Sequence, residues 1–215
     1  MPLQNRVTPE GEIIATPHRG LMFGNRGAFH LPDKSLSSRR WASKRWIVCL
    51  LEFKGRRRGE MMMPRRYTEL FFLDEATALA AGHRPCFECR REAGKRFAAL
   101  FPAQPGCRQP LRADEIDIIL HAERLGPGGK KATFSAQAGA LPDGAFVRAA
   151  VGGSLLPCLI ARQHLLVWSP AGYVAAAALG GQRTLEVLTP RSIIAVLCAG
   201  YRAMLHPSVS ALIGE

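Results

Sequence analysis

Two cysteines at metal-binding spacing are the clearest chemical signal in this sequence. Cys86 and Cys89 are separated by two residues, which allows both sulfurs to reach one ion from a tight turn. Thiolate pairs of this kind are typical ligands of Zn²⁺. A redox-active pair is the alternative, but Pro85 and the neighbouring arginines are not typical of that motif. The sequence therefore predicts that Cys86 and Cys89 bind Zn²⁺.

A short helix is expected to lead into this motif. Asp74 has the side chain of an N-cap residue, and Glu75 would lie in the first turn. Gly82 stands where a residue of left-handed conformation often ends a helix. We therefore predict a helix over residues 74–81, preceded by a strand over 69–73 and followed by a second helix over 88–100.

The residues around the two cysteines also carry a family resemblance. The string Ala-Leu-Ala-Ala-Gly-His-Arg-Pro-Cys-Phe-Glu-Cys at 78–89 resembles the second half of the Ada-type metal-binding domain of DNA methylphosphotriester repair proteins. It is also similar to the zinc modules appended to some bacterial nucleases. The resemblance covers about residues 70–90. It implies that Cys86 and Cys89 supply two of four zinc ligands to a DNA-associated module, with a role in DNA repair or modification.

The third and fourth ligands do not follow the family pattern. Ada-type domains carry a Cys-x-x-x-Cys pair upstream, where this chain has a Gly-Arg-Arg-Arg-Gly run. Cys49 and His30 are the nearest candidates, so we infer a site formed by His30, Cys49, Cys86 and Cys89. Four protein ligands would make the zinc site closed and structural, whereas convergence of only three would leave a position for water and favour catalysis.

Basic residues dominate the charge of the chain. The net charge is +12, and residues 39–96 hold fifteen Lys or Arg against seven Asp or Glu. This excess favours a polyanionic partner, above all DNA, although a basic face that contacts only solvent is the alternative interpretation. Guanidinium groups suit phosphate contacts. The candidate contacts are Arg39, Arg40, Arg56, Arg57, Arg58, Arg65, Arg66, Arg84, Arg90 and Arg91.

The bulk properties are those of a globular chain. Hydrophobic residues make up 47% and charged residues 21% of the sequence, and no apolar stretch is long enough to predict a membrane span. Six cysteines without a signal-peptide pattern favour a cytoplasmic location.

A proline-rich break divides the chain into two predicted modules. Residues 102–110 hold three prolines and a glycine, which oppose a continuous helix. Residues 1–101 would form a basic Ada-like zinc module, and residues 111–215 a β-rich domain whose role no motif indicates. The expected fold class is α+β.

Local patterns predict the elements of both modules. In the first, strands are expected over 13–15 and 46–53, with a tight glycine-rich turn over 20–27. In the second, Thr189 and Pro190 would begin a closing helix that ends before Gly200. The remaining elements are a helix over 114–125 and strands over 144–150, 155–161, 164–169, 172–177 and 184–188.

DNA binding through phosphate contacts is the favoured function, and three alternatives remain. The zinc thiolates could accept an alkyl group from a phosphotriester. His121 and Glu123 form the His-x-Glu of zinc deaminases, which also carry Pro-Cys-x-x-Cys, although here the order is reversed. Trp41 and Trp46 lie among basic residues and are further candidates for contact with a nucleic acid. A protein-interaction adaptor would instead bind its partner with little dependence on salt.

Overall fold

The fold is α+β and combines two sheets with helices that pack between and around them. A computed structural model describes residues 1–55, 59–106, 108–181 and 183–214. In this part of the chain both sheets have six strands. The helices are α1 (Glu75–Ala80), α2 (Arg91–Leu100), α3 (Ala113–Arg124), α4 (Arg191–Cys198) and α5 (Ser208–Ile213). No described helix is long and apolar enough to cross a bilayer.

The first sheet is mixed and comes from the N-terminal part of the chain. Its strand order is β2-β1-β5-β3-β4-β6, and the pairs β1–β5 and β4–β6 are parallel. The strands are β1 (Gln4–Val7), β2 (Ile13–Ala15), β3 (Met22–Asn25), β4 (Ile47–Leu50), β5 (Leu70–Phe72) and β6 (Arg84–Pro85).

The second sheet is antiparallel, with the order β11-β10-β9-β8-β12-β7. Five strands confirm the predicted ones to within two residues at either end: β8 (Phe146–Val151), β9 (Ser154–Ala161), β10 (His164–Ser169), β11 (Gly172–Ala178) and β12 (Thr184–Val187). The sixth, β7 (Phe134–Gln137), was not predicted. Its burial alternates between half-buried and exposed residues, so little hydrophobic periodicity marks it in the sequence.

The helix before the cysteine motif begins and ends as predicted. The backbone N–H and the hydroxyl of Thr77 both donate to Asp74 Oδ1, at 2.9 and 2.8 Å, so Asp74 is the N-cap of α1. Gly82 has φ +87°, and a Cβ on it would lie 2.7 Å from Cδ of Arg124. The sequence therefore requires glycine here both for backbone conformation and for close packing.

The predicted turn over residues 20–27 is wrong in its centre, where β3 runs. Gly20 and Gly27 do adopt positive φ, at the two ends of this segment. Gly24 lies inside the strand, and a Cβ on it would come within 2.2 Å of the Ile47 carbonyl oxygen. Glycine here permits a close approach between strands rather than a reversal of the chain.

The closing helix starts slightly later than predicted. Pro190 is the N-cap of α4, and the helix begins at Arg191. The Thr189 hydroxyl instead accepts a hydrogen bond of 2.9 Å from the Phe146 amide. Thr189 therefore ties the start of the helix to β8.

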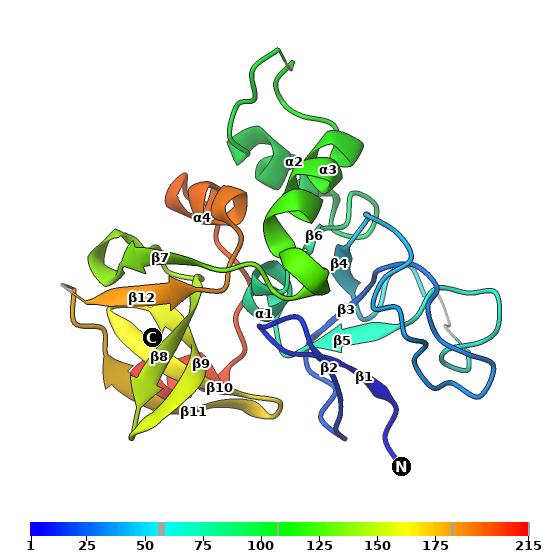
Figure 1. Cartoon of the computed structure of the whole chain (residues 1–215), viewed down its shortest axis with the longest axis horizontal. Coiled ribbons are helices and arrows are strands. Elements are labelled where there is room, and N and C mark those ends of the chain that lie inside the picture. Colours follow the sequence, from blue (N-terminus) through cyan, green and yellow to red (C-terminus); the bar gives the residue numbers. More distant parts are fainter. Residues whose placement is uncertain (56–58, 107, 182, 215) are drawn as a thin grey trace.

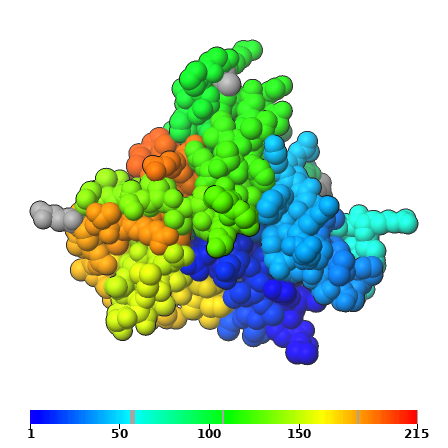
Figure 2. Space-filling model, in the orientation of Figure 1, coloured from blue at the N-terminus to red at the C-terminus, as the bar shows by residue number. Residues whose placement is uncertain are grey.

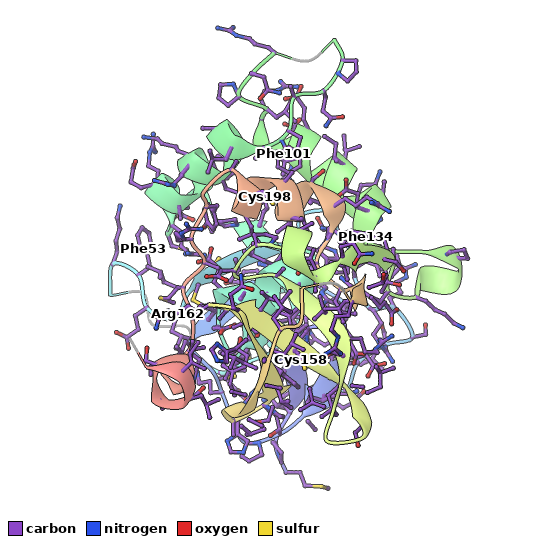
Figure 3. The ribbon with its side chains drawn as sticks, turned by 90° about the vertical axis from the view of Figure 1, so that its left-hand side faces the viewer. Phe53, Phe101, Phe134, Cys158, Arg162 and Cys198 are labelled. Atoms are coloured by element: carbon purple, nitrogen blue, oxygen red, sulfur yellow. The ribbon has the colours of Figure 1, made fainter. Side chains whose placement is uncertain are left out.

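Hydrophobic residues from both predicted modules pack in one cluster. Leu79 of α1, Phe97 of α2, Leu120 of α3 and Leu197 of α4 all belong to it. In Figure 1, α3 stands between the two sheets, and in Figure 2 its green surface contacts both the blue N-terminal and the orange C-terminal segments. Phe101, from the same cluster, lies beside α4 in Figure 3. The division at residues 102–110 stays a prediction, but the core extends across it.

Candidate metal centre

The structure brings three cysteine sulfurs together. The Sγ atoms of Cys49, Cys86 and Cys89 all lie within 4.8 Å of one another. Sulfurs bound to one tetrahedral zinc at 2.3 Å are about 3.8 Å apart, so a small contraction would suffice. These thiols are the donor set that zinc prefers, and the group can hold a metal ion.

A parallel strand pair places Cys49 next to the Cys-x-x-Cys turn. Val48 of β4 pairs with Pro85 of β6, and the Cys86 amide donates to the Val48 carbonyl at 2.9 Å. After this contact the chain turns tightly: the Arg90 amide donates to the Cys86 carbonyl at 3.1 Å, and the Glu88 amide to Cys86 Sγ at 3.4 Å. The cysteine turn is therefore fixed by backbone hydrogen bonds to β4 and within itself.

Contacts among the three thiols shift their pKa values in opposite directions. Hydrogen bonding with Cys49 and Cys89 lowers the pKa of Cys86 well below its ordinary value. The same contact with Cys86 raises the pKa of Cys49 far above its ordinary value. A divalent cation would remove this conflict, because it stabilises all three groups as thiolates.

The cysteines line a cavity of about 530 Å³, which Arg65, Arg66 and Glu69 also line. Glu69 is 4% exposed and accepts a hydrogen bond of 2.7 Å from the Met62 amide. Arg65 and Arg66 are both exposed to solvent. This cavity therefore connects the thiol cluster with a basic part of the surface.

His30, the fourth inferred ligand, is not part of the cluster. Its Nδ1 lies 2.9 Å from Thr68 Oγ1 and its Nε2 lies 3.2 Å from the Met63 carbonyl oxygen. Within the described ranges, the group contains three cysteines and no histidine, aspartate or glutamate. The chain between β3 and β4 carries His30 to Thr68, on the segment that precedes β5, and the sequence gives no signal of this contact.

Two of the candidate phosphate contacts have internal partners instead. Arg84 is 5% exposed and forms a two-pronged ion pair with Asp117, at 2.9 and 2.7 Å. Arg90 forms another with the buried carboxylate of Glu75, at 2.6 Å for both bonds. Both guanidinium groups hold helices in place, so we remove them from the predicted DNA-contacting set.

The remaining eight arginines fall into two groups. Arg39, Arg40, Arg65, Arg66 and Arg91 are exposed. Residues 56–58, which include three of the predicted contacts, lie outside the described residues. Arg39 and Arg40 line a second cavity, of about 600 Å³, together with Trp41, Lys44 and His121. Charged and aromatic groups therefore meet there, as the sequence suggested for Trp41. Trp46, the other predicted aromatic contact, is only 2% exposed, so we remove it from the predicted set.

The deaminase arrangement is not formed in the described structure. The ring of His121 packs edge-on against Trp41, with 5.8 Å between the centroids, and its Nδ1 lies 2.9 Å from Arg124 Nη2. Glu123 accepts hydrogen bonds from the amide and the hydroxyl of Ser192, at 2.9 and 2.7 Å. Neither residue belongs to the thiol cluster. Cys158 and Cys198, labelled in Figure 3, also lie outside it.

Comparisons with known proteins add no assignment to this geometry. No family model matches the chain, and the searches of curated proteins and of solved structures found no match either.

Proposed function

We propose that this chain binds one Zn²⁺ through Cys49, Cys86 and Cys89 and uses exposed arginines to bind DNA. The observation that carries the proposal is the convergence of three thiols on a cavity that Arg65 and Arg66 also line. An association with DNA repair or modification rests on the Ada-type resemblance of the cysteine segment.

Zinc is proposed because of the donor set and the state of the thiols. Sulfur ligands in tetrahedral spacing select zinc over the oxygen-preferring ions. All five described cysteines are free thiols, which suits a reducing compartment, and we therefore propose a cytoplasmic location.

DNA is proposed as the partner because of charge. The chain carries a net charge of +12, and five of the predicted arginine contacts are exposed. Phosphate contacts from such side chains release counterions, and the resulting affinity falls steeply as salt increases. A protein-interaction adaptor would lack this dependence.

Binding of a short DNA duplex is expected to show a logarithmic salt slope of about −4 to −5, since each phosphate contact contributes about −0.9. The double replacements Arg39→Ala with Arg40→Ala, and Arg65→Ala with Arg66→Ala, should each reduce the slope by about 2 and weaken binding on all sequences alike. Fluorescence anisotropy at increasing salt measures both effects. Arg202→Ala, an exposed arginine of the C-terminal half, is the control. Absence of binding at low salt, or a slope near zero, would refute DNA binding through phosphates.

A zinc-dependent enzyme acting on nucleic acid is a second candidate. It is favoured by one observation, that three protein ligands rather than four converge in the described structure. Catalytic zinc sites keep a position for water or substrate in this way. The zinc-loaded protein would be incubated with single-stranded, duplex and alkylated DNA, and both products and cysteine alkylation followed by mass spectrometry. No turnover and no alkyl transfer would leave a binding function only.

A further inference from the structure

A cavity that is separate from the thiol cluster is lined by six basic side chains, three of which are buried or half-buried and form no ion pair in the described structure. Arg26 and Arg124 are each 1% exposed, and Lys131 is partly buried. All three line a cavity of about 660 Å³. Its walls come from the first two strands, from the end of α3 and from Arg148 of β8, so it lies where the two sheets and α3 meet (Figure 1).

The hydrogen-bond partners of these cations are neutral. Arg26 Nη1 donates to the Gly11 carbonyl at 3.0 Å and Nε lies 3.3 Å from His83 Nε2, while its buried Nη2 has no partner among the described residues. Arg124 donates to the carbonyls of Gly82 and Lys44, at 2.8 and 2.7 Å. The Lys131 ammonium donates to the Ala80 carbonyl. Two buried guanidinium nitrogens, Nη2 of Arg26 and Nε of Arg124, therefore have no partner among the described residues.

Aromatic contact compensates part of this charge. The guanidinium carbons of Arg26 and Arg124 lie 3.9 and 4.0 Å from the centroid of the Trp46 ring, which is 2% exposed. The stabilisation that such cation–π contacts give a desolvated guanidinium group is modest. It is less than the cost of removing a cation from water without an ionic partner.

Of the carboxylates nearest these cations, Glu10 and Asp117 have other partners, and Glu12, which also lines the cavity, is exposed and forms no ion pair with them in the described structure. Glu10, at the edge of the cavity, is paired with Arg148. Asp117 is occupied by Arg84. Within the part of the chain that the structure describes, Arg26, Arg124 and Lys131 form no ion pair by the distances that define these contacts. Buried charges in proteins are normally paired, so this cluster is built for a negative charge from outside the chain.

We propose that this cavity binds a phosphate monoester, through Arg26 Nη2 and the Lys131 ammonium. Guanidinium groups match phosphate oxygens in geometry, and a dianion would balance most of the three positive charges. Trp41 and Arg40 line the same cavity toward the basic surface and would contact the group that carries the phosphate. The phosphate could belong to a free small molecule or to the end of a nucleic acid strand.

Calorimetric titration with inorganic phosphate and with sulfate tests the site directly. Lys131→Met is expected to lower the affinity for both anions about tenfold or more, because one charge-assisted hydrogen bond is lost. Lys95→Met, which removes an exposed lysine on α2, should leave the affinity unchanged. Equal affinity in wild type and Lys131→Met, or no binding at millimolar anion, would overturn the proposal.

Stability separates a binding role from a structural one. Because Lys131→Met removes an uncompensated cation, the anion-free variant should melt at or above the wild-type temperature at neutral pH or below, while the anion-bound wild type gains stability that the variant does not. A variant that melts lower and responds equally to sulfate would assign Lys131 a structural role only and refute the site.

The source of the phosphate is identified by competition against bound sulfate. Displacement by adenosine monophosphate indicates a small molecule, and displacement by an oligonucleotide only when it carries a 5′-phosphate indicates a strand end. Displacement by neither, while sulfate binds, would overturn the assignment to a phosphate monoester.

Sulfate affinity is also expected to fall as pH rises from 6 to 9. Desolvation, with repulsion from Arg26 and Arg124 and a weaker opposing effect of Glu10, lowers the pKa of Lys131 to about 7. Lys131 thus loses its proton, and with it the attraction for the anion, as pH rises past that value, whereas sulfate keeps its charge. Neighbouring His83 has a pKa lowered well below 6.5 by burial and stays neutral throughout. The dependence should vanish in Lys131→Met, and a pH-independent wild type would contradict the role of Lys131.

Discussion

Replacing Glu75 by alanine is expected to lower the free energy of unfolding by about 3–5 kcal/mol, the cost of breaking a buried ion pair from one side. Glu75 is 1% exposed and accepts two bonds from Arg90, one of 2.6 Å from the Tyr201 hydroxyl and one of 2.9 Å from the Met204 amide. Its loss leaves a nearly buried cation and two donors without acceptors. Urea unfolding followed by circular dichroism measures the change.

A matched control is available on the neighbouring helix. Glu92 of α2 is exposed and pairs with Lys95 at 3.2 Å, so Glu92→Ala should change stability by less than about 0.5 kcal/mol. A loss below about 1 kcal/mol in Glu75→Ala would mean that Arg90 and Tyr201 find other partners, and that the carboxylate does not hold the C-terminal segment to α1.

The same pair of acidic residues illustrates how far sequence patterns reach. Asp74 and Glu75 predict the start of a helix, and the capping bond to Thr77 confirms it. The Asp74 carboxylate also accepts from the Tyr173 hydroxyl, at 2.8 Å, and from the His206 amide, at 3.1 Å. These contacts join residues about a hundred positions apart. Local propensity carries no information about them, because they arise only when the second sheet and the segment between α4 and α5 pack on α1.

Site residues were likewise predictable where the signal is local and not where it depends on long-range contacts. The Cys-x-x-Cys spacing is local and therefore visible in the sequence. Cys49 was inferred as a ligand because it is the nearest upstream cysteine, and it does join the cluster. The contact that places it there, the parallel pair of β4 with the two-residue strand β6, is too short to leave a pattern in the sequence. Charge composition located a basic region but did not separate Arg84, which is paired with a carboxylate 33 residues away, from exposed arginines such as Arg39.

The buried cations were missed for a related reason. Arg26 and Arg124 look like ordinary basic residues in the sequence, and only the fold places both against Trp46. The glycine at position 82, which the sequence assigned to a helix stop, also makes room for the Arg124 side chain. Gly82 therefore has two roles: it ends the helix, which the sequence predicted, and it permits a long-range packing contact, which the sequence did not predict.

The zinc content of the purified protein tests both proposed functions, DNA binding and zinc-dependent catalysis. The expected result is one zinc per chain in the wild type. Cys49→Ser, Cys86→Ser and Cys89→Ser should each lose the metal, because a hydroxyl replaces one of three thiolates. If the free zinc concentration is about a thousand times the dissociation constant, loss of zinc binding lowers the free energy of unfolding by about 4 kcal/mol. Elemental analysis and thermal unfolding measure the two effects, with Cys158→Ser, outside the cluster, as control.

His30→Ala is the variant that separates a closed zinc site from an open one. His30 contacts Thr68 and Met63, so zinc should stay bound in this variant, and the fourth coordination position would belong to water or a substrate. That outcome would favour zinc-dependent chemistry in the cavity lined by Arg65 and Arg66. Loss of zinc in His30→Ala would instead mean that the histidine moves to the metal and closes the site, as a structural DNA-binding module requires. Zinc that persists in Cys86→Ser would refute the thiolate site itself.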